Sequence, residues 1–191
     1  MLAADLERLI GGGESYSLEF KRDINDSELT TNVVCLANGD GGLLLIGVDN
    51  DGAVIGARPR HGKATEPERL PALVANTTSP PVNVTASTVD VGGKTVIVIE
   101  VPKQTSLVST TSGVYVRRAL DVNGDAQCLP MQPHDAIARL ASIGQRDLSA
   151  MPVPDATSDD LDEIEIGRFR ESVRTIGDRT LAELSTEDLI S

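Results

Sequence analysis

The stretch Ala37 to Gly52 reads ANGDGGLLLIGVDNDG, and it decides how the rest of the chain is interpreted. Residues 43–48 are almost purely aliphatic, but the run is too short and too closely bounded by glycine for a helix, so it predicts a buried strand. A dinucleotide-binding fingerprint places its glycines after a strand, at the start of a helix. Here Gly39, Gly41 and Gly42 follow a helical pattern and precede the strand. They therefore predict a helix end and a tight turn.

Two other glycine-containing motifs do not qualify as ligand-binding loops. Residues 49–52, DNDG, lack the later oxygen ligands of a twelve-residue calcium loop. Residues 92–95, GGKT, resemble the end of a P-loop, but Thr88 stands where that motif requires its leading glycine. The first motif is therefore interpreted as an acidic turn. The second is interpreted as the turn of a β-hairpin between strands predicted at 82–91 and 94–101.

The segments on either side supply the remaining elements. Apolar residues recur at helical spacing over residues 1–10 and from Leu29 to Ala37, whereas residues 17–21 alternate as in a strand. A further helix is predicted near 70–77, a strand at 113–119, and a helix that opens at Pro133 with Ile137 facing inward. The order α-β-α-β-α-β-β-β-α predicts an α+β fold: a mixed, mostly antiparallel sheet flanked by helices.

Composition divides the chain into three parts. Residues 1–148 contain all the predicted strands and are expected to form one domain. Residues 149–160, SAMPVPDATSDD, are rich in Pro, Ser and Asp and predict an exposed linker. Residues 161–191 predict a short helical C-terminal extension, the start of a following region that is truncated. Residues 149–191 carry 11 acidic and 4 basic side chains, so much of the net charge of −12 lies outside the first domain.

Charge and cysteine content narrow the class of protein. No segment approaches the roughly 20 apolar residues of a membrane span, and the N-terminus lacks the features of a signal peptide. The two cysteines, Cys35 and Cys128, are too few for a disulfide framework, which favours a reduced, cytoplasmic location. The negative net charge argues against a protein that holds nucleic acid by bulk charge, but the mildly acidic first domain leaves room for local basic patches.

Two motifs occur in order: E-S-x-x-x-E-F-K over residues 14–21, and A-N-x-x-G-G-x-L-x-I-G-V-D over residues 37–49. With GVYVRR at 113–118, they make the chain from about Glu14 to Leu140 resemble the Schlafen-type AlbA domain. The resemblance implies a Schlafen AlbA-like fold and the DNA-binding role ascribed to bacterial transcriptional regulators that carry this domain. The chain departs from the family pattern at Ala119-Leu120, where members continue with Gly-Ser. That departure alters the backbone available for a phosphate contact.

The resemblance also extends to the eukaryotic Schlafen proteins, in which matching acidic positions form a metal-dependent ribonuclease site. It maps the catalytic and metal-binding roles onto Glu14, Glu19 and Asp49. Because Leu18 and Phe20 should face the core, we expect Glu19 on the outer face of its strand beside Lys21. Converging carboxylates repel one another unless a cation such as Mg²⁺ or Mn²⁺ binds them. The structural alternative is a Glu19–Lys21 ion pair, with Asp49 capping its turn.

Phosphate contacts are expected from basic side chains. Three of them fall in one loop, and adjacent residues of a strand point to opposite faces, so only one of Arg117 and Arg118 can join a given patch. Aromatic residues make up only 2% of the chain, too few to stack a run of single-stranded bases. Binding should therefore be directed at the backbone. The predicted nucleic-acid-binding residues are Lys21, Arg22, Arg58, Arg60, Lys63 and Arg117.

The sequence therefore predicts a nucleic-acid-binding domain, with DNA as the partner, from a cytoplasmic bacterial transcriptional regulator. No membrane contact is expected, no cofactor is required for binding alone, and a homodimer is compatible with the prediction. One alternative is a metal-dependent endoribonuclease that uses Glu14, Glu19 and Asp49 with Mg²⁺ or Mn²⁺ as cofactor. The second alternative is a protein interaction or dimerisation module.

Overall fold

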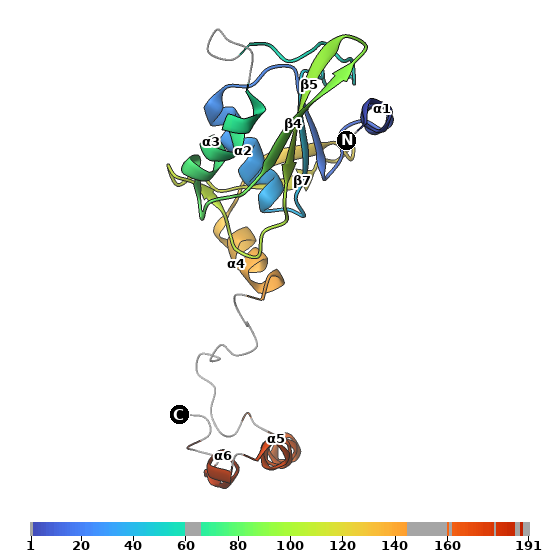
Figure 1. Cartoon of the computed structure of the whole chain (residues 1–191). Coiled ribbons are helices and arrows are strands. Elements are labelled where there is room, and N and C mark those ends of the chain that lie inside the picture. Colours follow the sequence, from blue (N-terminus) through green and yellow to red (C-terminus); the bar gives the residue numbers. More distant parts are fainter. Residues whose placement is uncertain are drawn as a thin grey trace. The chain divides into compact units, whose positions relative to one another are not determined.

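The computed structural model describes residues 2–59, 66–144, 160, 162–177, 179–185 and 188. The chain divides into two compact units, Met1–Arg146 and Asp147–Ser191. The first unit contains four α-helices and all the named strands, and the second contains α5 (Glu163–Ile176) and α6 (Arg179–Glu183) (Figure 1). In this described part, every helix is too short or too polar to cross a bilayer. The predicted linker, 149–160, falls almost entirely outside the described residues.

A four-stranded sheet forms the centre of the first unit, in the order β1-β2-β5-β4. Its strands are β1 (Leu18–Lys21), β2 (Gly42–Ile46), β4 (Thr85–Val91) and β5 (Lys94–Val101). β1 and β2 run parallel, whereas β2–β5 and β4–β5 are antiparallel. The predicted α+β fold with a mixed, mostly antiparallel sheet is confirmed. The aliphatic run after the glycine turn is a strand as predicted, although β2 ends at Ile46 and not at residue 48, and it pairs with β1.

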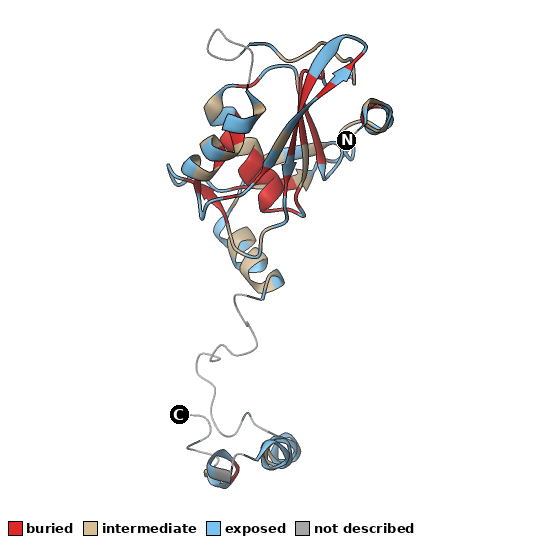
Figure 2. Cartoon of the chain, in the orientation of Figure 1, coloured by how far each residue is buried: buried red, intermediate tan, exposed pale blue. Residues whose placement is uncertain are grey.

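Helices cover both faces of this sheet (Figure 1). α2 (Asp26–Ala37) and α3 (Leu70–Thr77) lie on one face, and α1 (Ala3–Gly11) lies on the other. Consecutive residues of β2 supply the two cores, since Leu44 packs with α2 and Leu45 packs with Leu6 of α1. Both leucines are fully buried, and buried residues, drawn in red, run along the strands of the sheet in Figure 2. A strand buried on both faces explains the continuous aliphatic run.

The crossover from β1 to β2 uses local signals at each end of α2. The helix begins with a capping box in which Asn25 Oδ1 accepts from the Glu28 N–H at 2.9 Å and Glu28 Oε2 accepts from the Asn25 N–H at 3.1 Å. It ends before the predicted glycine turn. Gly42 has φ = 142°, and a Cβ there would lie 2.1 Å from the carbonyl oxygen of Ser17. Only glycine lets β2 pass so close to the segment that enters β1.

Two small sheets complete the first unit: β3 (Thr78–Ser79) with β6 (Ser109–Thr110), and β7 (Val116–Leu120) with β8 (Ala126–Pro130).

Three sequence predictions need correction. Residues 82–84 precede β4, and the Val82 N–H donates to the side chain of Thr78, with Oγ1 at 2.9 Å, instead of to a neighbouring strand. The 113–119 strand is shifted to 116–120, because Gly113 closes a turn after β6. α4 (Pro133–Ser142) opens at Pro133 as predicted, but Ile137 is 41% exposed instead of inward-facing.

The two cysteines are joined, so the expectation of reduced thiols is wrong, whereas the cytoplasmic location stays a prediction. Cys35 of α2 and Cys128 of β8 form a disulfide with their Cα atoms 5.8 Å apart, although 93 residues separate them in the chain. The bond ties the β7–β8 hairpin to α2. The cysteines are therefore part of the tertiary structure of the first unit, not free thiols.

Candidate nucleic-acid interface

Arg118 of β7 makes several hydrogen bonds, and its side chain is 0% exposed. Its guanidinium donates to the carbonyl oxygens of Ser15 at 2.7 Å, Leu18 at 3.1 Å and Tyr16 at 3.3 Å, and it also donates to Glu19 Oε2. A buried charge is tolerated only when it is paired and its donors are satisfied in this way. Arg118 therefore anchors the β7–β8 hairpin to β1 and is not available to a ligand.

Glu19 lies beneath this hairpin and is 6% exposed. It is paired in register with Leu44, so it points toward the face of the sheet that carries α2. The prediction that Glu19 lies on an outer face of the strand is wrong, because the β7–β8 hairpin supplies Arg118 to cover it. The predicted Glu19–Lys21 ion pair is present, with Lys21 Nζ donating to Glu19 Oε1. Both carboxylate oxygens of Glu19 are thus held by cations.

Glu14 precedes β1 and is half-buried. Its Oε1 accepts a hydrogen bond from the Phe20 N–H at 2.8 Å. Burial raises the pKa of Glu14 above its usual range, the Phe20 N–H opposes the shift, and the nearby charge of Glu19 adds to it. Glu14 therefore holds a proton more readily than an exposed glutamate does.

Asp49 follows β2 at an exposed turn. Its Oδ2 accepts from Arg22 Nη2 at 2.8 Å, its Oδ1 accepts from the Asn50 N–H at 3.1 Å, and its carbonyl oxygen accepts from the Gly52 N–H at 2.8 Å. These are the bonds of the acidic turn expected as the structural alternative. Asp49 therefore has a structural role at this turn.

The three acidic residues Glu14, Glu19 and Asp49 do not together fit a metal ion. Within the described ranges, no group of three or more His, Cys, Asp or Glu side chains is arranged to hold one. Glu19 has both oxygens on cationic partners, and Asp49 is engaged by Arg22. A divalent cation would have to displace these partners before it gained a set of oxygen ligands. The catalytic assignment of the three acids stays a prediction.

The predicted binding residues fall into two places. Lys21 and Arg22 end β1, and Arg58 lies beside them, since its Nη1 is 3.9 Å from Asp23 Oδ2. We call Lys21, Arg22 and Arg58 the β1-end basic cluster; their side chains are 31%, 57% and 67% exposed. Arg117 instead forms an ion pair with Asp135 of α4, with Arg117 Nε 2.9 Å from Asp135 Oδ1. Arg60 and Lys63 lie outside the described residues.

Asn38 is a site-forming residue that the sequence marked only as a helix end. Its side chain is buried, with Nδ2 donating to the carbonyl oxygens of Val108 at 2.8 Å and Val116 at 2.9 Å, and Oδ1 accepting from the Val108 N–H at 2.9 Å. One amide thereby holds the segment before β6 and the start of β7 to the end of α2. The Asn of the A-N motif is thus explained by backbone hydrogen bonding. Its only signal in the sequence is an Asn-Gly at a predicted helix end.

The fold defines an α+β domain in which a buried Arg–Glu pair locks a hairpin onto a parallel strand pair. The family described as Schlafen, AlbA_2 matches residues 14–123, more than half of the chain. The chain belongs to this family, as the resemblance of its motifs implied. No curated protein matches the sequence significantly.

Two solved structures are similar to the chain. One is the crystal structure of the DIP2311 protein from Corynebacterium diphtheriae, with 21% identity and a TM-score of 0.52 over 98% of this chain. The chain spans 40% of the length of that protein. The other is the N-terminal domain of a RecG-related protein from Nitrosomonas europaea, with 23% identity, a TM-score of 0.43, and coverage of 70% of this chain and 97% of that one. The likeness to DIP2311 supports the fold alone.

Proposed function

We propose that the first unit binds nucleic acid, with DNA as the partner, through phosphate contacts from the β1-end basic cluster. The observation that carries the proposal is the gathering of Lys21, Arg22 and Arg58 at one end of β1, in a domain of the Schlafen, AlbA_2 family. The setting we propose is a transcriptional regulator in a bacterial cytoplasm. Arg60 and Lys63 follow Arg58 in the sequence, and they are further candidates for phosphate contacts.

Two of the three ion pairs of this cluster favour an exchange of partners, whereas Lys21 pairs with the buried Glu19. Arg22 pairs with Asp49 and Arg58 with Asp23, and the acidic side chains are themselves 32% and 46% exposed. An exposed ion pair contributes about 0–1 kcal/mol, so replacing its carboxylate with a phosphate costs little. Phosphate contacts fix the register of a protein on a duplex without reading its sequence. The proposal therefore supports backbone-directed binding, with affinity that falls as salt rises.

The test is the salt dependence of duplex DNA binding by wild type and by Arg22→Ala/Arg58→Ala. The double variant should bind more weakly to all sequences, and the slope of log K against log salt should flatten by about 0.9 for each phosphate that the variant no longer neutralises. The control is Arg8→Ala/Arg69→Ala, which removes the same charge from side chains that are 80% and 81% exposed. Equal slopes for both double variants would contradict the proposal, because bulk charge alone would then explain the effect.

DNA is distinguished from RNA in the same assay. Duplex DNA should compete for the β1-end basic cluster more effectively than tRNA at equal salt and equal nucleotide concentration. A stronger effect of Arg22→Ala/Arg58→Ala on tRNA binding than on DNA binding would make RNA the partner.

A ribonuclease is the second candidate function, favoured by one observation: Glu14 and Glu19 lie close enough for the charge of one to raise the pKa of the other. The matched variant is Glu14→Gln/Asp49→Asn, because Glu19 cannot be changed without leaving Arg118 unpaired. Under the binding proposal, wild type leaves tRNA intact in millimolar Mn²⁺ or Mg²⁺. Cleavage that this double variant abolishes would replace binding with catalysis.

Protein interaction is a third candidate, favoured by exposed apolar side chains on the β7–β8 hairpin. Leu120 is 57% exposed, Val122 is 100% exposed and Leu129 is 38% exposed. A second copy of the chain is the partner we propose for this surface. Light scattering after size exclusion should show a concentration-dependent dimer that Leu120→Ser/Val122→Ser weakens. A monomer at all concentrations would remove this candidate.

The domain boundary belongs to the same proposal. We propose that residues 1–148 fold alone, that 149–160 act as a linker and that 161–191 begin a following region. The Pro-, Ser- and Asp-rich composition of 149–160 supports this division. Limited proteolysis should cut there first and leave a stable product that ends near residue 148. First cuts within α4 or α5 would place the boundary elsewhere.

A further inference from the structure

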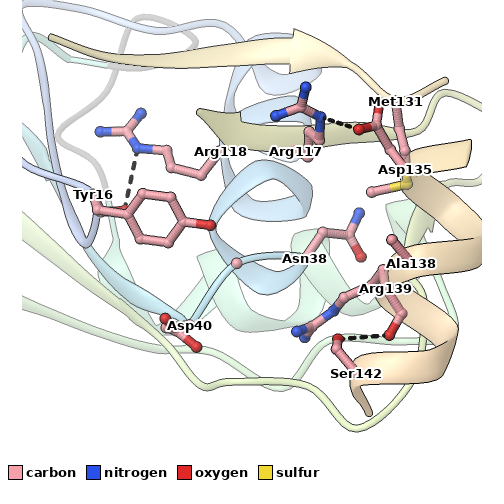
Figure 3. Close-up of a pocket in the computed structure, with 11 residues that line it drawn as sticks. Tyr16, Asn38, Asp40, Arg117, Arg118, Met131, Asp135, Ala138, Arg139 and Ser142 are labelled. Atoms are coloured by element: carbon pink, nitrogen blue, oxygen red, sulfur yellow. Dashed lines mark hydrogen bonds and ion pairs between the residues drawn. The ribbon is translucent and has the colours of Figure 1, made fainter. Parts of the chain in front are cut away.

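A cavity of about 340 Å³ lies between the end of α2, β7 and α4, and its lining includes no residue of the β1-end basic cluster (Figure 3). Its lining includes Tyr16, Gly39 and Asp40 on one side and Met131, Ala138 and Arg139 on the other. All these elements belong to the first unit. The volume falls in the usual range for small-ligand pockets, roughly 300–1,000 Å³. A single inorganic phosphate would leave most of it empty.

Most charges around the cavity form ion pairs, and the hydrogen-bonded Lys103 acts with the charge of Arg139 to lower the pKa of Asp40. Arg118 is paired with Glu19, Arg117 with Asp135, and Asp40 with Lys103 at 2.7 Å. Arg139 has no carboxylate within ion-pair distance among the residues the structure describes. Its Nη2 donates to the carbonyl oxygen of Gln104 at 3.0 Å, and its Nε is buried without a hydrogen-bond partner in the same part of the chain. A guanidinium has five N–H donors, and the bond to Gln104 uses only one of those on Arg139, so the others can donate to an anion.

Tyr16 supplies the second polar group. Its ring lies over Gly39, where an added Cβ would be 3.3 Å from ring atom Cε1. Its hydroxyl points into the cavity from the side opposite α4, and the guanidinium of Arg139 extends into the same space from α4 (Figure 3). Ala138 and Met131 add apolar surface along the α4 side. The cavity therefore combines an anion-binding end with apolar walls and an aromatic edge.

We propose that this cavity binds a single nucleotide, with its phosphate held by Arg139 and the Tyr16 hydroxyl and its base packed against Met131 and Ala138. An arginine matches a phosphate with two parallel N–H donors. The ligand is a free 5′-mononucleotide or one nucleotide of a bound strand, since both present the same phosphate and base. This site goes beyond the proposed function, because its lining includes no residue of the β1-end basic cluster and it does not require a long nucleic acid.

The experiment is a titration of the whole chain with thymidine 5′-monophosphate or adenosine 5′-monophosphate, in which calorimetry measures the heat of binding. Thymidine and adenosine without phosphate serve as ligand controls and should bind at least tenfold more weakly, because they lack the charge-assisted contact. Arg139→Gln should weaken mononucleotide binding about tenfold or more. Its control, Arg8→Gln, makes the same change at a side chain that is 80% exposed on α1 and should leave affinity unchanged.

Arg139→Gln also removes the bond to Gln104, so a second variant is needed that removes no bond. Ala138→Leu adds bulk at an exposed position of α4 that lines the cavity and should block the nucleotide while the melting temperature stays near that of wild type. The proposed site would be overturned if Ala138→Leu and Arg139→Gln left the mononucleotide affinity unchanged. It would also be overturned if the nucleoside bound as tightly as its monophosphate. The absence of any heat of binding at millimolar nucleotide would overturn it as well.

Binding of a short oligonucleotide distinguishes the two possible ligands, a nucleotide of a bound strand and a free mononucleotide. If Ala138→Leu weakens oligonucleotide and mononucleotide binding alike, the cavity takes one nucleotide of a strand. If it weakens only the mononucleotide, the ligand is free in solution. Duplex binding that depends on Arg22 and Arg58 without any mononucleotide binding would overturn this site and leave the proposed function standing. The reverse result would leave the site standing and overturn the proposed function.

Discussion

Two arginine–carboxylate ion pairs lie at or next to β1, and they differ in how far they are exposed to solvent. Arg118–Glu19 is buried, with the arginine side chain 0% exposed and three carbonyl oxygens as further acceptors. Arg22–Asp49 is exposed, with the arginine side chain 57% exposed. The extent of burial determines the role of each ion pair. The buried pair holds a hairpin in place and cannot open without leaving a charge unpaired, whereas the exposed pair can change partners at little cost.

Removing the buried arginine should have the largest effect on the free energy of unfolding. Arg118→Met leaves the Glu19 carboxylate buried without its guanidinium partner, which should lower the free energy of unfolding by about 3–5 kcal/mol. Urea denaturation followed by circular dichroism measures this loss. The double variant Arg118→Met/Glu19→Leu should recover much of it, because no uncompensated charge remains. A loss below about 1 kcal/mol for Arg118→Met would show that the pair behaves as an exposed one.

Gly42→Ala should have the next largest effect, because it disturbs the segment that presents the carbonyl oxygens to Arg118. An added Cβ would meet the Ser17 carbonyl oxygen at 2.1 Å, at φ = 142°. We expect a loss of about 3 kcal/mol in the free energy of unfolding. The control is Gly93→Ala in the β4–β5 turn, where φ is 80° and the Cβ has open space. It should cost about 1 kcal/mol, and equal losses at the two positions would contradict the contact argument.

Breaking the exposed pair should change stability little. Arg22→Ala is expected to lower the free energy of unfolding by less than about 1 kcal/mol, measured in the same urea titration. Its effect should appear in the salt slope of DNA binding instead. If Arg22→Ala destabilised the fold as much as Arg118→Met, the contrast between the two pairs would fail.

The smallest effect is expected at Glu14 and has a defined pH dependence. Burial raises the folded-state pKa of Glu14 above its ordinary value of 4.5, so the folded chain binds more protons than the unfolded one between the two pKa values. Stability is therefore lost as pH rises from about 4.5 through the folded-state pKa. Glu14→Gln should remove this loss, so its unfolding free energy relative to wild type should rise between pH 4 and pH 7. A constant difference across that range would contradict the assignment.

The local elements could be predicted because their signals are local. The glycine turn, the aliphatic strand after it and the Gly92-Gly93 hairpin each follow from a few adjacent residues, and all three are present. The start of α4 at Pro133 follows from a residue whose fixed φ suits the first helical turn. The acidic turn at Asp49 was also readable as one of two alternatives.

The tertiary arrangement could not be predicted, because it depends on residues far apart in the chain. Alternation in β1 placed Glu19 outward, and only the hairpin that arrives 99 residues later covers it. The Cys35–Cys128 bond has the same origin, since the count of cysteines does not reveal that α2 and β8 adjoin. No sequence pattern pointed to Arg139, because it lines a cavity whose walls come from separate elements of the chain.

The hydrogen bonds of Asn38 should affect how fast this residue deamidates. It is followed by Gly39, and an Asn-Gly pair is the one in which the next amide nitrogen attacks the side chain with least hindrance. Here the side-chain amide is committed to three backbone hydrogen bonds, and the Gly39 N–H is engaged with the carbonyl oxygen of Leu36 at 3.0 Å. Deamidation would replace two donated bonds with a carboxylate facing two carbonyl oxygens. The folded state should therefore preserve this asparagine through long storage, and the unfolded chain should lose it.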